Sequence, residues 1–343
     1  MSSSTSFSAV VCGAGGISNA WFPPLQAEGV RVAAVVDLRL ESAQAQIAKY
    51  GLADCEAATD LAAMLKRHRP DFVLDLTIPE AHCAVTCAAL RAGCHVIGEK
   101  PMAATLAQAR KMVRTAEQTG RLYMVSQSRR WEPRHYTVRD TVASGRLGTL
   151  TTLNCDFYIG AHFGGFRDQM PSPLILDMAI HHFDLARFFG AGTPVAVYAH
   201  EFNPHGSWYK GDVAATCIFE MENGAVFTYR GSWCAEGCPT SWHGDWRLIG
   251  DRGTLIYEQD QEPRGQLLAG PEEGFNRPLK ELEITPSQPP QTGMHGALLE
   301  MLAFLRTGKT PQTECHDNIR SLAMVLAAIH SAKLKRRVRI PTA

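Results

Sequence analysis

The sequence predicts a doubly wound α/β domain over residues 1–128, followed by an α+β domain over residues 129–343. Three observations predict this division. The length of 343 residues fits two domains. Apolar runs alternate regularly with segments of helical periodicity up to residue 128. Beyond that point most strand-like runs follow one another directly, and helical periodicity is strong again near the C-terminus.

The first part of the chain alternates predicted strands and helices. Strands are predicted for FSAVVCGAG, VRVAAVVD, DFVLDLTI, HVIGEK and LYMVSQS. Helices are predicted for ESAQAQIAKYG, DLAAMLKRH, EAHCAVTCAALRAG and TLAQARKMVRTAEQTG, with Asp60 and Thr105 near two starts and Gly51, Gly93 and Gly120 at ends. Helices between strands imply right-handed crossovers and a parallel sheet. The nearly all-apolar strands fit a sheet that is covered on both faces.

The second part is predicted to begin with a helix over WEPRHYTVRDTVASG. Strands follow at GTLTTLNCDFYIG, PVAVYAHEFN, DVAATCIFEM and AVFTYRGSW, with a hairpin turn at residues 222–224 and a second hairpin at RLIGDRGTLIYE. PEEGFNRP and ITPSQPPQTG are loop-like, and HGALLEMLAFLRTG and NIRSLAMVLAAIHSAK are helical. Consecutive strands predict a large, open, mostly antiparallel sheet. Its uncovered face favours a homo-oligomer, a dimer or tetramer formed through this sheet.

Composition excludes several classes of partner. The chain has 34 basic residues (Lys plus Arg) and 34 acidic residues (Asp plus Glu). This balance of charge does not favour binding to nucleic acid or to an anionic membrane. No apolar stretch reaches the roughly 18 residues of a membrane span. MSSSTSF lacks the pattern of a signal peptide, and the ten cysteines show no disulfide or zinc spacing. We therefore expect reduced thiols and a cytoplasmic protein.

The turn GAGGIS after the first strand is typical of a dinucleotide-binding site. Gly13 permits the tight turn, and Gly15 lets the backbone approach a pyrophosphate at the following helix N-terminus. The third glycine position holds Ser18, so the motif is incomplete. Asp37 ends the second strand, 24 residues after Gly13, where a carboxylate can bind the adenosine ribose hydroxyls. It would repel a 2′-phosphate, which favours NAD over NADP, although Arg39 lies nearby.

Three segments together resemble one enzyme family. GAGGIS, GEKPMA at residues 98–103 and the D-x-x-x-H segment LDMAIHHFDLAR are similar to the glucose–fructose oxidoreductase, inositol dehydrogenase and rhizopine-catabolism family (Gfo/Idh/MocA) of NAD(P)-dependent oxidoreductases. TIPEAH at residues 77–82 extends the likeness, which covers nearly the whole chain and is strongest to the inositol dehydrogenase branch. The proline pair at residues 23–24 and PSPLIL before Asp177 depart from the family pattern.

The resemblance implies a Rossmann domain, a substrate-binding and oligomerisation domain, and roles for the matching residues. The implied cofactor-binding residues are Gly13, Gly15, Gly16, Ile17, Asp37, Thr77, Pro79, His82, Glu99 and Lys100. Glu99 and Lys100 would lie under the nicotinamide, with Lys100 also reaching the substrate. Asp177 and His181 would complete the catalytic group. We expect Lys100 and His181 to meet across a crevice between the two domains.

The segment LILDMAIHHFDLARFF, residues 174–189, supports the same chemistry from its own residues. In a helix, Asp177, His181 and Asp184 would share one face, while His182 is rotated by about 100° from His181. The histidines diverge and lack zinc spacing, so no metal is expected. Alcohol oxidation needs a proton acceptor, for which His181 is suited. Lys100 can stabilise the developing alkoxide, and Asp177 can orient His181.

The substrate pocket is expected from the second domain. Candidate substrate-binding residues are Lys100, Arg130, Tyr158, His162, Arg167, Asp177 and His181, with Arg129, His182 and Trp242 as further polar or aromatic candidates. The leading function is NAD-dependent oxidation of a secondary hydroxyl of a sugar, anhydrosugar or inositol, or the reverse reaction. Redox-assisted glycoside cleavage and a non-catalytic cofactor-binding regulator are the alternatives.

Overall fold

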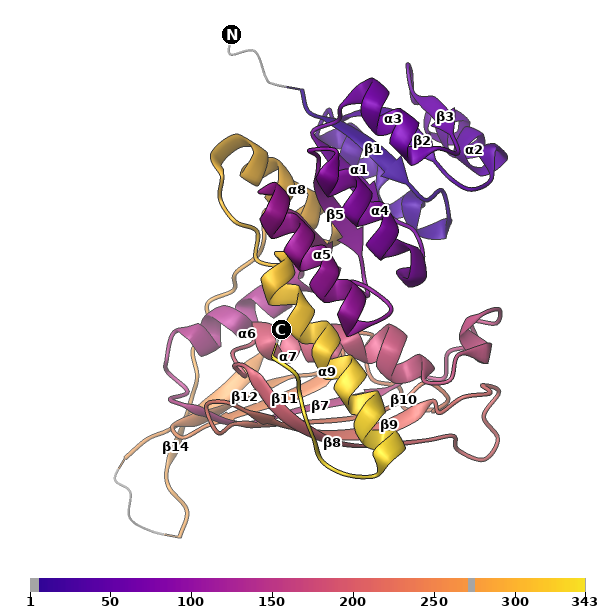
Figure 1. Cartoon of the computed structure of the whole chain (residues 1–343). Helices are drawn as coiled ribbons and strands as arrows, with labels where there is room; N and C mark the ends of the chain where they lie inside the picture. Colours follow the sequence, from indigo (N-terminus) through magenta and orange to yellow (C-terminus); the bar gives the residue numbers. More distant parts are fainter. Residues whose placement is uncertain (1–5, 271–274, 343) are drawn as a thin grey trace. The chain divides into compact units, whose positions relative to one another are not determined.

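The computed structural model describes residues 6–270 and 275–342, and Figure 1 shows its elements. The chain forms two compact units. The first comprises the chain up to Ser128 together with Gln291–Ile319, and the second comprises Arg129–Pro290 and the chain from Arg320 onward. The predicted second domain included everything after residue 128, so residues 291–319 differ from the predicted division.

Residues 291–319 join the first unit through helix packing and backbone pairing. Helix α8 (Gly293–Thr307) packs against α1 (Phe22–Ala27), and His295 pairs with Glu28 at 2.7 Å. The amide of Val125 donates to the carbonyl of Thr313 at 3.1 Å. Helical periodicity reveals an apolar face but does not say which sheet that face covers. The sequence pattern therefore could not assign this segment.

The first unit contains the predicted parallel sheet, here with six strands, which confirms the fold class. Its strands are β1 (Ser8–Cys12), β2 (Arg31–Val36), β3 (Glu56–Ala58), β4 (Phe72–Asp75), β5 (His95–Glu99) and β6 (Tyr123–Ser126). Its helices include α2 (Leu40–Tyr50), α3 (Leu61–His68), α4 (Pro79–Arg91) and α5 (Leu106–Thr119). The order is β3-β2-β1-β4-β5-β6. The three-residue edge strand β3 was not predicted, because it is too short to show a pattern.

The strand order places a topological switch point between β1 and β4, where ligands of such sheets bind beyond the carboxyl ends. Gly13 follows β1 with φ +102°. A Cβ there would lie 2.6 Å from the carbonyl oxygen of Leu76, at the end of β4. Only glycine fits this crossing of two strand ends.

The segment after the glycine turn is not one regular α-helix. A 3₁₀ turn, η1 (Gly16–Ala20), precedes α1. Ser18, at the third glycine position, is buried and donates from Oγ to the carbonyl of Gly15 at 2.6 Å, which closes the turn. Pro23 and Pro24 stand at the start of α1, where backbone N–H groups have no helical acceptor. The proline pair is therefore compatible with the fold.

The second unit contains a nine-stranded sheet in the order β14-β13-β12-β11-β7-β10-β9-β8-β15. Its strands are β7 (Leu150–Tyr158), β8 (Pro194–Phe202), β9 (Ala214–Met221), β10 (Val226–Ser232), β11 (Asp245–Gly250), β12 (Gly253–Tyr257), β13 (Arg264–Leu268), β14 (Leu279–Glu281) and β15 (Val338–Arg339). The predicted hairpins are present. The sheet is mixed, however, because β7 and β10 pair in parallel. The short strands β13, β14 and β15 were not predicted, and residues 271–274 of a predicted loop lie outside the described residues.

One face of this sheet is covered by α6 (Pro133–Ala143), α7 (Ile180–Phe188) and the later part of α9 (Cys315–Leu334), as Figure 1 shows. Aromatic side chains fill the layer between helices and sheet. Phe183 of α7 meets Phe219 of β9 edge to face at 4.7 Å between ring centroids. Such burial is the main stabilising contribution of the layer.

Two composition-based expectations concern spans and thiols. Within the described ranges, we find no helix whose length and hydropathy would suit a bilayer crossing. All ten cysteines are free, and seven of them are buried.

Candidate functional site

The glycine turn is open, and Asp37 is fixed beside it. Asp37 Oδ2 accepts from the amide of Ala14 at 2.8 Å, and Oδ1 accepts from the amide of Arg39 at 3.0 Å. A Cβ at Gly15 or Gly16 would meet no atom within 4 Å, so a ligand can approach this backbone closely. Each carboxylate oxygen retains acceptor capacity for a ribose hydroxyl. The turn and the acid thus occupy the positions that a dinucleotide requires.

A buried carboxylate organises the end of β4. Asp75 is fully buried and accepts from Thr77 Oγ1 at 2.6 Å and from Thr86 Oγ1 at 2.8 Å. His82 Nδ1 lies 2.9 Å from Asp75 Oδ1, and His82 is 1% exposed. His82 therefore does not line an open groove, contrary to the prediction. It pairs with Asp75 in the core, and Asp75 in turn binds Thr77. Asp75 was missed, although its position at a strand end in DLTIPEAH was a usable signal.

Thr77 and Pro79 remain positioned for the predicted groove. Thr77 is partly exposed beyond the end of β4, and Pro79 opens α4 at its first turn. The bond from Thr77 to buried Asp75 fixes the rotamer of the threonine. Ile17, 37% exposed in η1, also faces solvent next to the glycine turn. These side chains surround the switch point of the sheet.

Glu99 and Lys100 follow the neighbouring strand β5. Glu99 is 6% exposed and accepts from Trp21 Nε1 at 2.9 Å and from the amide of Lys100 at 3.2 Å. Burial raises the pKa of Glu99. Lys100 is partly exposed and precedes a cis proline, Pro101. Trp21 was not anticipated, because nothing in the sequence connects it to residue 99.

The D-x-x-x-H segment is not one continuous α-helix. A π-helical turn, η4 (Leu174–Ala179), precedes α7. Four α-helical residues overshoot a full turn by about 40°, and a wider π turn reduces that overshoot. Asp177 and His181 are both partly exposed, whereas residues 178–180 and His182 between and beside them are buried. The local structure thus presents Asp177 and His181 together.

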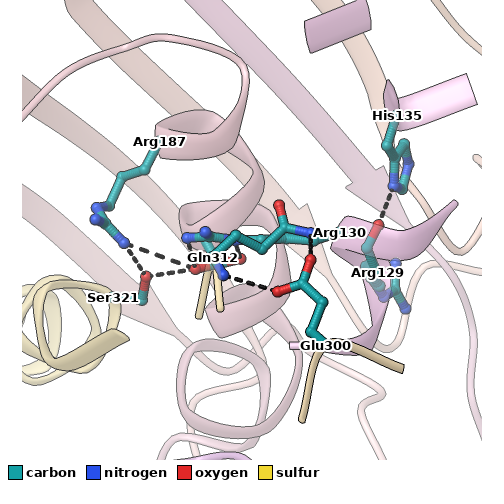
Figure 2. Close-up of polar contacts among 8 residues, drawn as sticks. Arg129, Arg130, His135, Arg187, Glu300, Gln312 and Ser321 are labelled. Carbon is teal, nitrogen blue, oxygen red and sulfur yellow. Dashed lines mark hydrogen bonds and ion pairs between the residues drawn. The ribbon is translucent and has the colours of Figure 1, made fainter. Parts of the chain in front are cut away.

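Asp184 does not share that exposed face, contrary to the prediction. It is 1% exposed and accepts from Arg130 through two bonds, Nε to Oδ2 at 2.7 Å and Nη2 to Oδ1 at 2.8 Å. Ser321 Oγ donates to Asp184 at 2.7 Å, and Arg187 donates to Ser321 at 2.8 Å. Figure 2 shows Arg130, Arg187 and Ser321 converging in this network. Arg130, 4% exposed, is therefore a core residue and not a substrate ligand.

Arg167 binds the candidate catalytic carboxylate. Its Nε lies 2.6 Å from Asp177 Oδ2, and the two side chains are 33% and 14% exposed. His162 pairs with Glu236 at 2.9 Å, and Tyr158 is partly exposed at the end of β7. The loop that carries Arg167 thus contacts the segment that carries Asp177.

Two further predicted candidates have structural roles. His182 is fully buried, and its ring stacks on that of Tyr229 with 5.5 Å between the ring centroids. Burial lowers the pKa of His182 well below its ordinary value. Arg129 donates to the carbonyl of Trp242, and burial lowers its pKa to about 10. His182 thus belongs to the packed interior of the second unit, whereas Arg129 is partly exposed at its boundary with solvent. Trp242 itself is 44% exposed.

Metal-ligating side chains converge at one place among the described residues. Glu314, Cys315 and His316 have their ligand atoms within 4.8 Å of one another. His316 Nδ1 lies 2.7 Å from Glu314 Oε1, and His316 Nε2 lies 2.9 Å from Glu117 Oε1. The hydrogen bond to Glu117 contributes most to the raised pKa of His316. These ion pairs account for the cluster, and we assign no metal to it.

Comparison with known families identifies both parts of the chain. The GFO_IDH_MocA model, described as "Oxidoreductase family, NAD-binding Rossmann fold", matches residues 7–127. The "GFO/IDH/MocA C-terminal domain" model matches residues 135–256. The matches confirm the oxidoreductase family and the NAD-binding domain expected from the sequence. They do not single out an inositol dehydrogenase branch.

Individual proteins extend the comparison. D-apiose dehydrogenase from Paraburkholderia graminis is 28% identical over 91% of this chain and 84% of its own length. D-glucoside 3-dehydrogenase from Escherichia coli is 35% identical over 52% of each chain. An oxidoreductase from Agrobacterium radiobacter, solved in complex with NAD⁺, L-tartaric acid and magnesium, superposes with a TM-score of 0.84 at 23% identity, covering 98% of this chain and 99% of that one. The similarity to the Agrobacterium radiobacter structure supports the fold described above.

Proposed function

This chain belongs to the GFO/IDH/MocA family of oxidoreductases with an NAD-binding Rossmann fold, and we propose that it oxidises a secondary hydroxyl of a sugar, anhydrosugar or inositol to a ketone, or catalyses the reverse. The observation that carries the proposal is that Asp177 and His181, four residues apart where a π turn meets α7, are both partly exposed while residues 178–180 between them are buried. The dehydrogenases of D-apiose and D-glucosides among its relatives support a sugar substrate.

The proposed roles follow from the chemistry of alcohol oxidation. When bound, NAD accepts a hydride at nicotinamide C4. His181 takes the hydroxyl proton, for which an imidazole is suited near neutral pH. Lys100 donates a hydrogen bond to the same oxygen and stabilises its developing negative charge. Asp177 orients His181 and is itself held by Arg167 at 2.6 Å.

Asp37 is proposed to select NAD over NADP. Asp37→Ala is expected to weaken NAD binding by about tenfold or more, because it removes charge-assisted hydrogen bonds of about 1.5–3 kcal/mol to the ribose. NADP binding should weaken less, because the repulsion of a 2′-phosphate disappears as well. Titration of both cofactors by fluorescence checks this. Asp54→Asn, which removes a charge at an exposed position of the same unit and suits its φ of 57°, is the control. An unaltered preference between the two cofactors would contradict the assignment.

The proposed reaction is tested with a panel of inositols, aldoses and anhydrosugars, each assayed by NADH absorbance with NAD and with NADP. Accumulation of NADH with a free sugar or inositol is the expected result. Glycoside cleavage without net NADH would favour redox-assisted cleavage instead. Cofactor binding without turnover of any compound would favour a regulator.

We also propose a homo-oligomer formed through the nine-stranded sheet. Large apolar side chains are exposed on its neighbouring strands β8 and β9, among them Tyr198 at 44% and Ile218 at 42%, which pair directly. Contiguous exposed apolar surface is typical of an interface. Sedimentation that finds only a 37.6 kDa species at micromolar concentration would refute the oligomer.

A further inference from the structure

Exposed aromatic rings gather beside Asp177 in the second unit. Phe163 is 44% exposed, Phe166 is 66% exposed and Trp242 is 44% exposed. Phe163 and Trp242 lie 6.1 Å apart between ring centroids, and Phe163 packs edge to face on buried Trp233 at 5.0 Å. Several large rings exposed together are uncommon on a surface that has no binding role. We call Phe163, Phe166 and Trp242 the aromatic platform.

The loop that carries two of these rings is held in place by the unit beneath it. The amide of Ala161 donates to the carbonyl of Trp233 at 3.0 Å, and the carbonyl of Ala161 accepts from Trp208 Nε1 at 3.2 Å. Gly164 and Gly165 have φ of +68° and +67°, a conformation that other residues rarely adopt in succession. The two glycines turn the chain between the two phenylalanines. The platform is therefore a defined part of the fold.

Arg167 joins the platform to the candidate catalytic group. Its guanidinium lies 5.0 Å from the ring centroid of Phe163 and 4.7 Å from that of Phe166. Its Nε also lies 2.6 Å from Asp177 Oδ2. A sugar ring whose hydroxyl reaches Asp177 and His181 would therefore have the platform next to it. Because Arg167 is paired with Asp177, its guanidinium is not free to bind a phosphate or carboxylate.

His162, next to Phe163 in the chain, and its partner Glu236 supply polar groups. His162 stacks on Trp208 at 3.7 Å between ring centroids and pairs with Glu236 at 2.9 Å. Both partners are well exposed, at 62% and 69% of their side chains. Apolar ring faces bordered by groups that donate and accept hydrogen bonds match a sugar ring, which has apolar C–H faces and a rim of hydroxyls. A purely apolar ligand would make no hydrogen bonds with these polar groups.

We propose that the aromatic platform is a subsite for a second sugar ring, so that the substrate is a disaccharide or related glycoside whose oxidised ring carries another ring. This inference rests on the proposed function and deepens it. One sugar face covers about one aromatic face, so three exposed rings, two of which also contact the Arg167 guanidinium, offer stacking surface for a second ring beside the reacting one. In the reaction the oxidised carbon loses a hydride to NAD⁺ and its hydroxyl loses a proton to His181, giving a ketone and NADH, and the glycosidic bond stays intact.

The test compares kcat/KM for maltose, cellobiose and trehalose with kcat/KM for methyl α- and β-glucoside. At least one disaccharide is expected to exceed its matched methyl glucoside by about tenfold, because each aromatic stack contributes roughly a three- to tenfold gain. Phe166→Ala and Trp242→Ala are expected to bring this ratio toward one. Phe275→Ala removes a fully exposed ring elsewhere in the same unit and is expected to keep the ratio.

Several outcomes overturn the proposal. Disaccharides no better than methyl glucosides would do so while leaving the dehydrogenase function intact. Equal losses on both substrate types in Phe166→Ala and Trp242→Ala would show that the platform holds the reacting ring. If no compound turns over, saturation-transfer NMR with the same disaccharides still decides, because binding that weakens in Phe166→Ala but not in Phe275→Ala supports the subsite although the proposed function has failed.

Discussion

Lys100→Met is expected to lower kcat by about 100-fold or more, because methionine keeps the length of the side chain but cannot stabilise the developing alkoxide. Lys100 follows buried Glu99 at the end of β5, and the carboxylate of Glu99 accepts from its amide at 3.2 Å. The substitution leaves this backbone contact intact. It also leaves the glycine turn and Asp37 untouched, so NAD binding should be retained. Steady-state kinetics with the best substrate of the panel, together with NAD titration, measures both quantities.

A matched control separates this role from a general effect of charge. Lys111→Met removes a positive charge at an exposed position of α5 in the same unit and is expected to change kcat by less than twofold. If Lys100→Met also kept turnover within about twofold of the wild type, the proposed stabilisation of the alkoxide by Lys100 would be wrong. The family membership would remain.

Asp184→Asn is expected to destabilise the second unit by about 3–5 kcal/mol, because it leaves the buried Arg130 guanidinium without a compensating charge. Asp184 accepts two bonds from Arg130, at 2.7 and 2.8 Å, and one from Ser321 at 2.7 Å. The network therefore connects the start of the second unit with α7 and α9 (Figure 2). Urea unfolding followed by circular dichroism measures the loss.

Two comparisons make this result specific. Asp156→Asn breaks the pair with Arg230, whose side chain is 59% exposed, and should cost at most about 1 kcal/mol. The double substitution Arg130→Met with Asp184→Leu leaves Arg187 as the one buried charge of the network, whereas Asp184→Asn leaves both Arg130 and Arg187, so the double variant should be more stable than Asp184→Asn alone. Equal losses for Asp184→Asn and Asp156→Asn would contradict a special role for the buried network.

The candidate site was predictable wherever its residues follow strand ends or repeat at helical spacing. Gly13, Asp37, Thr77 and Lys100 each come one or two residues after a parallel strand, and such positions meet at one edge of the sheet. Asp177 and His181 are four residues apart, so almost any helix brings them together. The supporting contacts of Asp75 with His82 and of Trp21 with Glu99 join residues distant in the chain or hidden in the core. The strand-end position could have suggested Asp75 itself, but no local pattern identifies the partner in such a pair.

The sequence by itself determined the parallel sheet, the glycine turn and the helix ends, because these depend on interactions within a few residues. Gly51 and Gly120 end α2 and α5 in the left-handed conformation, as their positions predicted. The tertiary structure alone decided that residues 291–319 join the first unit and that β7 pairs in parallel with β10. It also decided that Asp184 is buried with Arg130 while Asp177 stays accessible with Arg167. The local sequence around a carboxylate, an arginine or an apolar helix face does not specify its partner. Packing between segments far apart in the chain determines which partner each one has.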